Sequence, residues 1–101
     1  MGSRLDLHNI FVGLLGSRNV YFQPPSTVTM LYPCIVYSRS NVDTKFADNG
    51  PYVRKKRYMV TVIDKNPDSL VPDKVGNLPM CIFDRNYTAD NLNHDVFNIY
   101  F

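Results

Sequence analysis

Two strand-like segments in the middle of the chain, separated by a polar stretch rich in turn residues, limit the folds open to this sequence. The first reads PCIVYSRS, residues 33–40, and the second reads VRKKRYMVTVID, residues 53–64. Between them, residues 41–52 contain Asp48-Asn49-Gly50-Pro51, which is a strong turn signal. Strands joined in this way form a long β-hairpin. We therefore predict such a hairpin, with an irregular loop over residues 41–52.

The composition favours strands and turns over helices. All nine acidic residues are Asp, and the chain has ten Asn but only two Ala and no Glu. Seven Tyr and six Phe accompany many Val and Ile, which are typical of strands. Because strong helix formers are scarce, we expect a β-rich chain with few helices. A length of 101 residues indicates one domain, spanning residues 1–101, that can bury a core of its own.

The N-terminal segment SRLDLHNIFVGLLG, residues 3–16, is the clearest helix in the sequence. Its apolar residues recur at helical spacing and share one face. Ser3 is a suitable N-cap, Asp6 suits the first turn, and Gly16 is a natural C-terminal stop. His8 has no second His or Cys one turn away, so we interpret it as a boundary residue rather than a ligand.

The segment PDSLVPDKVGNLP, residues 67–79, predicts a second, short helix. Asp68 or Ser69 is available as its N-cap, and Pro72 falls within the first turn. The apolar side chains of the segment share one face, and the helix is expected to end near Gly76-Asn77.

Three further strands complete the prediction. NVYFQPP, residues 19–25, is a short strand that ends at two prolines. MCIFDRNYTADNLNHDVFNIYF, residues 80–101, contains two strands around a turn. The expected fold is therefore α+β, with a mostly antiparallel sheet, a long β-hairpin, and the N-terminal helix and the second short helix packed on one face.

Asp64 and Asp68 lie close together where a strand gives way to the second helix, and they allow two interpretations. They are candidates for a metal site or an acid/base pair, which needs a third converging group such as Asp84 or Asp95. Asp is equally expected in a turn and at a helix N-cap. We interpret these two residues as turn and cap residues and predict no metal site.

The other candidates for chemistry are weaker. His94 and Asp95 are adjacent on a strand, and neighbours on a strand point to opposite faces. Cys34 and Cys81 lie in apolar runs without zinc-ligand spacing, so we expect two buried thiols. No catalytic or phosphate-binding motif is present, so we predict neither an enzyme nor a cofactor.

The basic run Arg54–Arg57 is the strongest local charge in the sequence. Beside tyrosines it is compatible with a nucleic-acid groove, with a charged edge strand, or with a protein contact. A net charge of +2 favours the last two. No apolar run is long enough to span a bilayer and no secretory signal is evident, so a cytosolic protein is expected.

Beyond these inferences, the sequence resembles a known protein family. The segments YFQPPSTVTMLYPCIVYSRS, FADNGPY, RYMVTVIDKNPDS and FDRNYTADNLNHDVFNIYF are similar to the small tail terminator proteins, also called tail completion or neck proteins, of long-tailed bacteriophages. The likeness runs from the first helix to the last strand, and YPCIVY and VTVIDKNPDS are its most specific parts.

The resemblance implies a structural protein of the virion that is assembled in the cytoplasm of the host bacterium. Such proteins form a ring, commonly of six copies, that caps the tail tube and stops its polymerisation. The implied partners are other copies of the chain, the tail tube protein and the head-side connector, with DNA passing through the lumen without sequence-specific contacts and with no membrane or cofactor.

On this basis the long hairpin is expected to contact neighbouring subunits or the tube. The residues expected to make these contacts are Lys45, Phe46, Asp48, Arg54, Lys55, Lys56 and Arg57. The alternatives are a head–tail stopper or adaptor protein, a small single-stranded nucleic-acid-binding domain, and an Asp-based metal enzyme.

Overall fold

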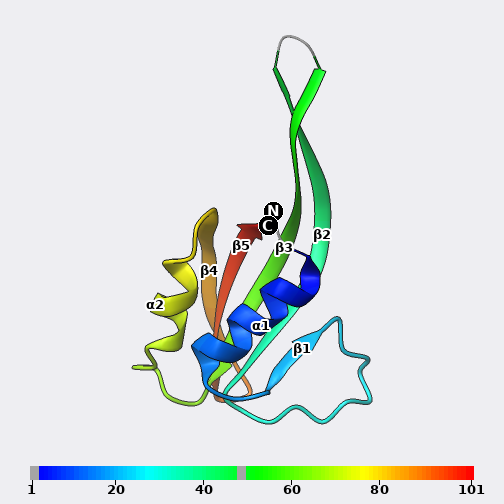
Figure 1. Ribbon diagram of the computed structural model, residues 1–101. Helices are drawn as coiled ribbons and strands as arrows, with labels where there is room; N and C mark the ends of the chain where they lie inside the picture. Colours follow the sequence, from blue (N-terminus) through cyan, green and yellow to red (C-terminus); the bar gives the residue numbers. More distant parts are fainter. Residues whose placement is uncertain (1–2, 48–49) are drawn as a thin grey trace.

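The computed structural model describes residues 3–47 and 50–101, and describes side chains for residues 3–40 and 56–101 (Figure 1). Its elements are α1 (Arg4–Leu15), β1 (Val20–Phe22), β2 (Cys34–Ala47), β3 (Gly50–Asp64), α2 (Val71–Gly76), β4 (Cys81–Ala89) and β5 (Leu92–Tyr100). The predicted α+β fold with two helices and a long hairpin is confirmed.

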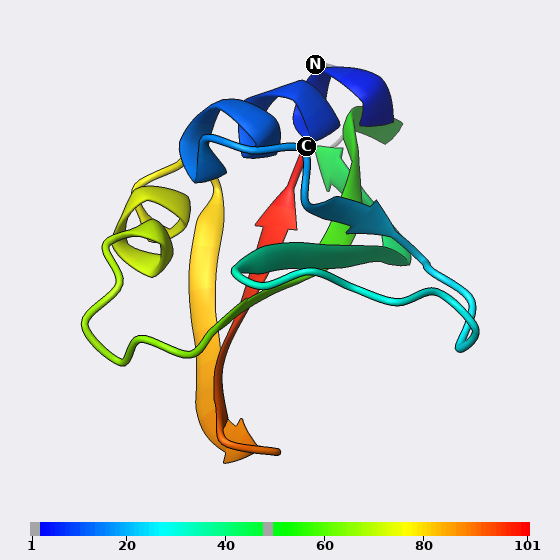
Figure 2. The same ribbon diagram turned by 90° about the horizontal axis from the view of Figure 1, so that it is seen from below.

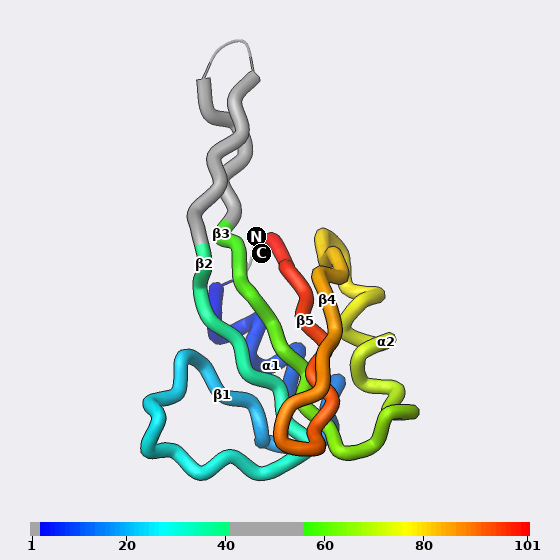
Figure 3. The backbone as a smooth tube through the Cα atoms, turned by 180° about the vertical axis from the view of Figure 1, so that it is seen from behind, coloured from blue at the N-terminus to red at the C-terminus, as the bar shows by residue number. Residues whose placement is uncertain are grey.

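The strands form one five-stranded sheet in the order β1-β2-β3-β5-β4. The short edge strand β1 runs parallel to β2, and every other pair in the sheet is antiparallel. Figure 2 shows α1 lying across one face of the sheet with α2 beside it. Figure 3 shows the opposite face, which carries no helix. We call the first of these surfaces the helix-side face; the opposite face also carries buried side chains, those of Cys34, Ile63 and Val96.

The hydrophobic core lies between the helices and the helix-side face. Alternation along each strand directs every second side chain to this face, which explains why the apolar periodicity of the sequence gives one continuous core. Its buried members are Leu7, Phe11, Val20, Ile35, Tyr37, Tyr58, Val60, Val62, Val75, Phe97 and Ile99. The core thus takes residues from both helices and from four of the five strands.

The ends of α1 follow the sequence signals closely. The Ser3 hydroxyl accepts a hydrogen bond from the Asp6 backbone N–H, and the Asp6 carboxylate accepts one from the Ser3 backbone N–H. This reciprocal pair is a capping box, which satisfies two donors that the helix leaves unpaired. At the other end Gly16 has φ 77°, and its N–H donates to the Val12 carbonyl. Both predicted ends of the helix are confirmed.

The same substitution at two glycines of this segment, Gly13 and Gly16, should have opposite effects on stability. A Cβ atom at either Gly13 or Gly16 would meet no atom within 4 Å, so neither position is sterically restricted by its neighbours. Gly13→Ala should raise the free energy of unfolding by about 0.5–1 kcal/mol, because alanine has the higher helix propensity. Gly16→Ala should lower it by about 1 kcal/mol, because the left-handed conformation strains an L-residue. Urea unfolding of both variants measures the difference, and equal signs would contradict it.

The prediction of an irregular loop over residues 41–52 is wrong. β2 continues to Ala47 and β3 begins at Gly50, with Ala47 paired to Gly50. Between the apolar Val42 and Phe46 lie three polar residues, so no clear strand pattern marks this segment, and its pairing with β3 makes it a strand. Pro51 is tolerated because this part of β3 pairs with β2 and not with β5, whose pairing stops at Arg57. Residues 48 and 49 lie outside the described residues.

The prediction of α2 is confirmed, but its predicted cap is only partly right. Leu70 occupies the N-cap position without a side-chain hydrogen bond, and Pro72 lies in the first turn. The Ser69 hydroxyl accepts a hydrogen bond from the Val71 backbone N–H at 3.2 Å. The exposed side chain of Asp68 accepts no capping hydrogen bond among the described residues, and its backbone N–H donates to the Asn66 side chain. The helix starts too late for Asp68 to reach its free N–H groups.

This correction predicts different effects for two neighbouring substitutions. Ser69→Ala should lower the free energy of unfolding by about 0.5–1.5 kcal/mol, because the Val71 N–H loses its acceptor. Asp68→Ala should change it by less than about 0.5 kcal/mol, as for other exposed side chains. Thermal unfolding of the two variants compares them, and a larger loss for Asp68→Ala would restore the cap to that residue.

Candidate functional site

The contact residues predicted from the sequence lie on the two strands of the long hairpin. Lys45 and Phe46 belong to β2, and the basic run Arg54–Arg57 belongs to β3. Lys45 pairs with Val53, one residue before the basic run. Asp48 lies outside the described residues, as do the side chains of Lys45, Phe46, Arg54 and Lys55.

The described end of the basic run is Lys56 and Arg57, which have different surroundings. Lys56 is exposed, and its carbonyl accepts a hydrogen bond from the Phe101 backbone N–H. Arg57 is half-buried, and its guanidinium donates to the Ser40 hydroxyl at 3.3 Å. Arg57 therefore contributes to the structure of the hairpin, whereas Lys56 leaves a positive charge at the surface.

Asp64 is a turn residue, as predicted. Its carboxylate accepts a hydrogen bond from the Asn66 backbone N–H at 2.9 Å, which is the pattern of an Asx turn. Asp84, one proposed third ligand, forms an ion pair with Arg85 at 3.0 Å. Asp95, the other, lies across a pocket from Asp73. Within the described residues, no three His, Cys, Asp or Glu side chains are grouped in a way that could hold a metal ion.

Adjacent residues of β5 point to opposite faces, as predicted for His94 and Asp95. His94 stacks on Tyr87 of β4 with ring centroids 4.6 Å apart, whereas Asp95 lines a pocket beside α2. Cys34 is buried as expected, and burial, with a smaller effect from Asp64, raises the pKa of its thiol to about 11. Cys81 is only partly buried, against the prediction, because it starts the edge strand β4.

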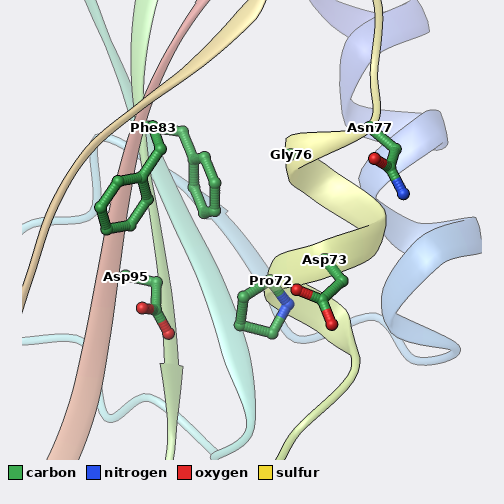
Figure 4. Close-up of a pocket in the computed structure, with 7 residues that line it drawn as sticks. Pro72, Asp73, Gly76, Asn77, Phe83 and Asp95 are labelled. Atoms are coloured by element: carbon green, nitrogen blue, oxygen red, sulfur yellow. The ribbon is translucent and has the colours of Figure 1, made fainter.

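A pocket of about 600 Å³ opens between α2 and the β4–β5 hairpin (Figure 4). α2 supplies one side of the pocket, and the helix-side face of β4 and β5 supplies the other. The lining residues are Pro72, Asp73, Gly76, Asn77, Phe83, Asp95 and Phe97. The pocket thus combines two carboxylates with two phenyl rings.

The electrostatics of this pocket are set mainly by its two carboxylates. Neither Asp73 nor Asp95 has a hydrogen-bond or ion-pair partner for its carboxylate among the described residues. Burial, followed by the charge of Asp73, raises the pKa of the Asp95 carboxyl, and His94 opposes this shift. The pocket is therefore a region of negative potential bounded by aromatic rings.

A second polar cluster ties α1 to the sheet. Arg4 donates to the Tyr37 hydroxyl at 3.3 Å, and the His8 ring Nδ1 lies 2.8 Å from the same oxygen. Since Tyr37 accepts from Arg4, its O–H is available to donate to a neutral His8. Burial and, secondly, the Arg4 charge lower the pKa of His8. The cluster thus favours a neutral imidazole, which suits a structural contact.

This cluster predicts a dependence of stability on pH. Because the pKa of folded His8 lies below its ordinary value of 6.5, the unfolded chain binds the proton more readily. The contribution of neutral His8 to the free energy of unfolding is complete above pH 6.5, and it is lost as the pH falls through the lowered pKa of His8. The free energy of unfolding should therefore fall between pH 7.5 and pH 5.5, and His8→Gln should reduce this slope. An unchanged slope in the variant, measured by urea unfolding, would exclude His8 as its source.

Most of the exposed large apolar side chains among the described residues lie at the two opposite edges of the sheet, and Leu5 of α1 and Leu70 before α2 are the others. At one edge, the β4 patch consists of Met80, Ile82, Phe83 and Tyr87. At the other, the segment that leaves β1 carries the β1 patch, which consists of Val28, Leu31 and Tyr32. Ile82 is 61% exposed and Leu31 is 63% exposed, which is high for side chains of this type. These patches are different surfaces on one subunit.

Neither the pocket nor the two patches was predicted from the sequence. Asp73 and Asp95 were separate polar residues on different elements, and only the sheet order brings them together. A usable signal for the β4 patch was the apolar pair Ile82-Phe83, because adjacent strand residues cannot both face one core. No helix in the described part of the chain is long and apolar enough to cross a membrane.

Comparisons of this chain with protein-family models, with curated proteins and with solved structures found no match.

Proposed function

We propose that this chain is a structural protein of a bacteriophage neck, a tail terminator that caps the tail tube as a ring. The resemblance of its sequence to that family motivates the proposal. In this role the chain is not an enzyme; it ends polymerisation of the tube and offers a docking surface to the head connector. It acts in the virion after assembly in the host bacterial cytoplasm.

The observation that best supports a ring is the pair of apolar patches at opposite edges of the sheet. A closed ring is built from head-to-tail contacts, in which each subunit presents two different surfaces. The β4 patch and the β1 patch are such a pair, since they differ in residues and lie across the sheet from one another. Contact between them in adjacent copies would remove apolar surface from water.

The long hairpin supports contact with further partners. β2 and β3 continue their pairing from Val42 and Lys56 to Ala47 and Gly50, where neither pairs with any other described strand. A two-stranded extension of this kind adds little to the core of its own subunit. The hairpin residues named from the sequence therefore stay our predicted contacts with the tube or with neighbouring subunits.

The decisive experiment is a polymerisation assay with the tube protein encoded in the same genome. Tubes assembled with this chain should stop growing and carry a ring at one end in electron micrographs, whereas tubes assembled without it should grow long. Equal length distributions would contradict tail termination. Strong binding of the free chain to single-stranded DNA, with a steep loss as salt rises, would instead favour the nucleic-acid-binding alternative.

A mixing experiment tests the head-to-tail contact. Leu31→Asp disables the β1 patch and Ile82→Asp disables the β4 patch, and each substitution is at an exposed position. Each variant alone should remain monomeric at concentrations where the unmodified chain associates. An equimolar mixture should form 1:1 dimers but no closed ring, because one intact contact surface remains on each partner. Native mass spectrometry measures this, and a mixture that stays monomeric would refute the pairing of these two patches.

A further inference from the structure

The pocket beside α2 holds a carboxylate at the border of the apolar core. Asp95 shares the helix-side face of β5 with the core residues Phe97 and Ile99 on one side and with Asn93 on the other. Its partner on β3 is the buried Val62, and its partner on β4 is the exposed Asn86. A half-buried carboxylate in such surroundings costs stability unless its charge is balanced. Asp95 therefore lies at the boundary between the apolar core and the polar end of the strand, where burial disfavours its charge.

A second carboxylate increases this cost. Asp73, from the first turn of α2, lines the same pocket as Asp95, and Figure 4 shows Pro72 between the two. Neither has a polar partner among the described residues. Burial, followed by the charge of Asp73, raises the pKa of the Asp95 carboxyl, because both disfavour its charged form. A positive group in the pocket would relieve both.

The walls of the pocket are suited to an organic cation. Phe83 and Phe97 form an edge-to-face pair with centroids 5.5 Å apart, and Phe83 is 54% exposed. Phenyl faces attract ammonium and guanidinium groups and also cover hydrocarbon stems. Gly76 brings the helix backbone close to this pair, since a Cβ atom there would lie 3.3 Å from the Phe97 ring.

The same features argue against a metal ion. Calcium takes six to eight oxygen ligands, and magnesium requires a near-octahedral set. The pocket offers two carboxylates and no third acidic, His or Cys side chain within the described residues. A volume of about 600 Å³ is also that of a site for a small organic group.

We propose that this pocket binds an alkylguanidinium or alkylammonium group, with its charged head between Asp73 and Asp95 and its stem against Phe83 and Phe97. The group has two possible sources, an arginine or lysine side chain of a protein partner and a free amine. The inference rests on the pocket alone and does not require the neck function.

The first test is a titration followed by amide chemical shifts of the full chain. n-Butylguanidinium and n-butylammonium should cause saturable shifts centred on Gly76, Asn77 and Phe83, with a dissociation constant of about 1–10 mM for so small a ligand. n-Butanol, which has the same stem but no charge, should cause no such shifts. Equal shifts with n-butanol, or no saturable shifts with either cation, would overturn the proposal.

Matched variants identify the groups that bind. Asp95→Asn and Asp73→Asn keep the size of each side chain but remove its charge, so each should weaken n-butylguanidinium binding about tenfold or more. Asp84→Asn is the control, because this carboxylate is paired with Arg85 and lies outside the pocket. Unchanged affinity in both pocket variants would overturn the proposal. If Asp95→Asn does not fold, two substitutions at exposed positions replace it. Asp73→Asn removes the other charge and Phe83→Leu removes an aromatic ring of the pocket wall, and each should weaken binding of n-butylguanidinium.

The source of the cation is distinguished by a second ligand. A pentapeptide with a central arginine flanked by glycines presents the same guanidinium on a polypeptide. Tighter binding of this peptide than of n-butylguanidinium would assign the pocket to a protein side chain, and equal or weaker binding would assign it to a free amine. In either case competition between peptide and n-butylguanidinium is expected, and its absence would contradict a shared site.

Discussion

The arrangement of this domain depends on the contacts of one buried side chain, the phenol of Tyr37. Its ring, on the helix-side face of β2, packs against Phe11 of α1, Phe22 of β1 and Tyr58 of β3. Its hydroxyl cannot be left unpaired at that depth, and Arg4 and His8 of α1 satisfy it. One side chain therefore fixes the position of a helix and two strands, through both packing and hydrogen bonding.

The β4 patch and the cation pocket lie at the β4 edge of the sheet, away from Tyr37. The edge strand β4 contributes the β4 patch on its surface and Phe83 to the pocket, while α2 covers only part of it. A division of this kind is common, because a rigid region supports a region whose surface is left free to bind. The ring contact that we propose and the cation site thus lie side by side, and Phe83 belongs to both.

The sequence predicted the local features well and the long-range ones poorly. Ser3, Asp6 and Gly16 defined α1 because capping is decided within a few residues. The strand character of residues 41–47 depends on pairing with β3, which outweighs the preference of polar residues for turns. Asp73 and Asp95 line the same pocket because β5 lies between β3 and β4. No local sequence pattern indicates this strand order.

The strand order also shapes the route by which the chain folds. β2 with β3 and β4 with β5 are hairpins between neighbours in sequence, whereas the β3–β5 pairing joins them across α2 and the whole of β4. Local hairpins close quickly, but the joining contact has to close a longer loop and loses more chain entropy. We therefore expect docking of the two hairpins to be the slow event in folding, with Val60 and Phe97, which pair across that seam, in its nucleus.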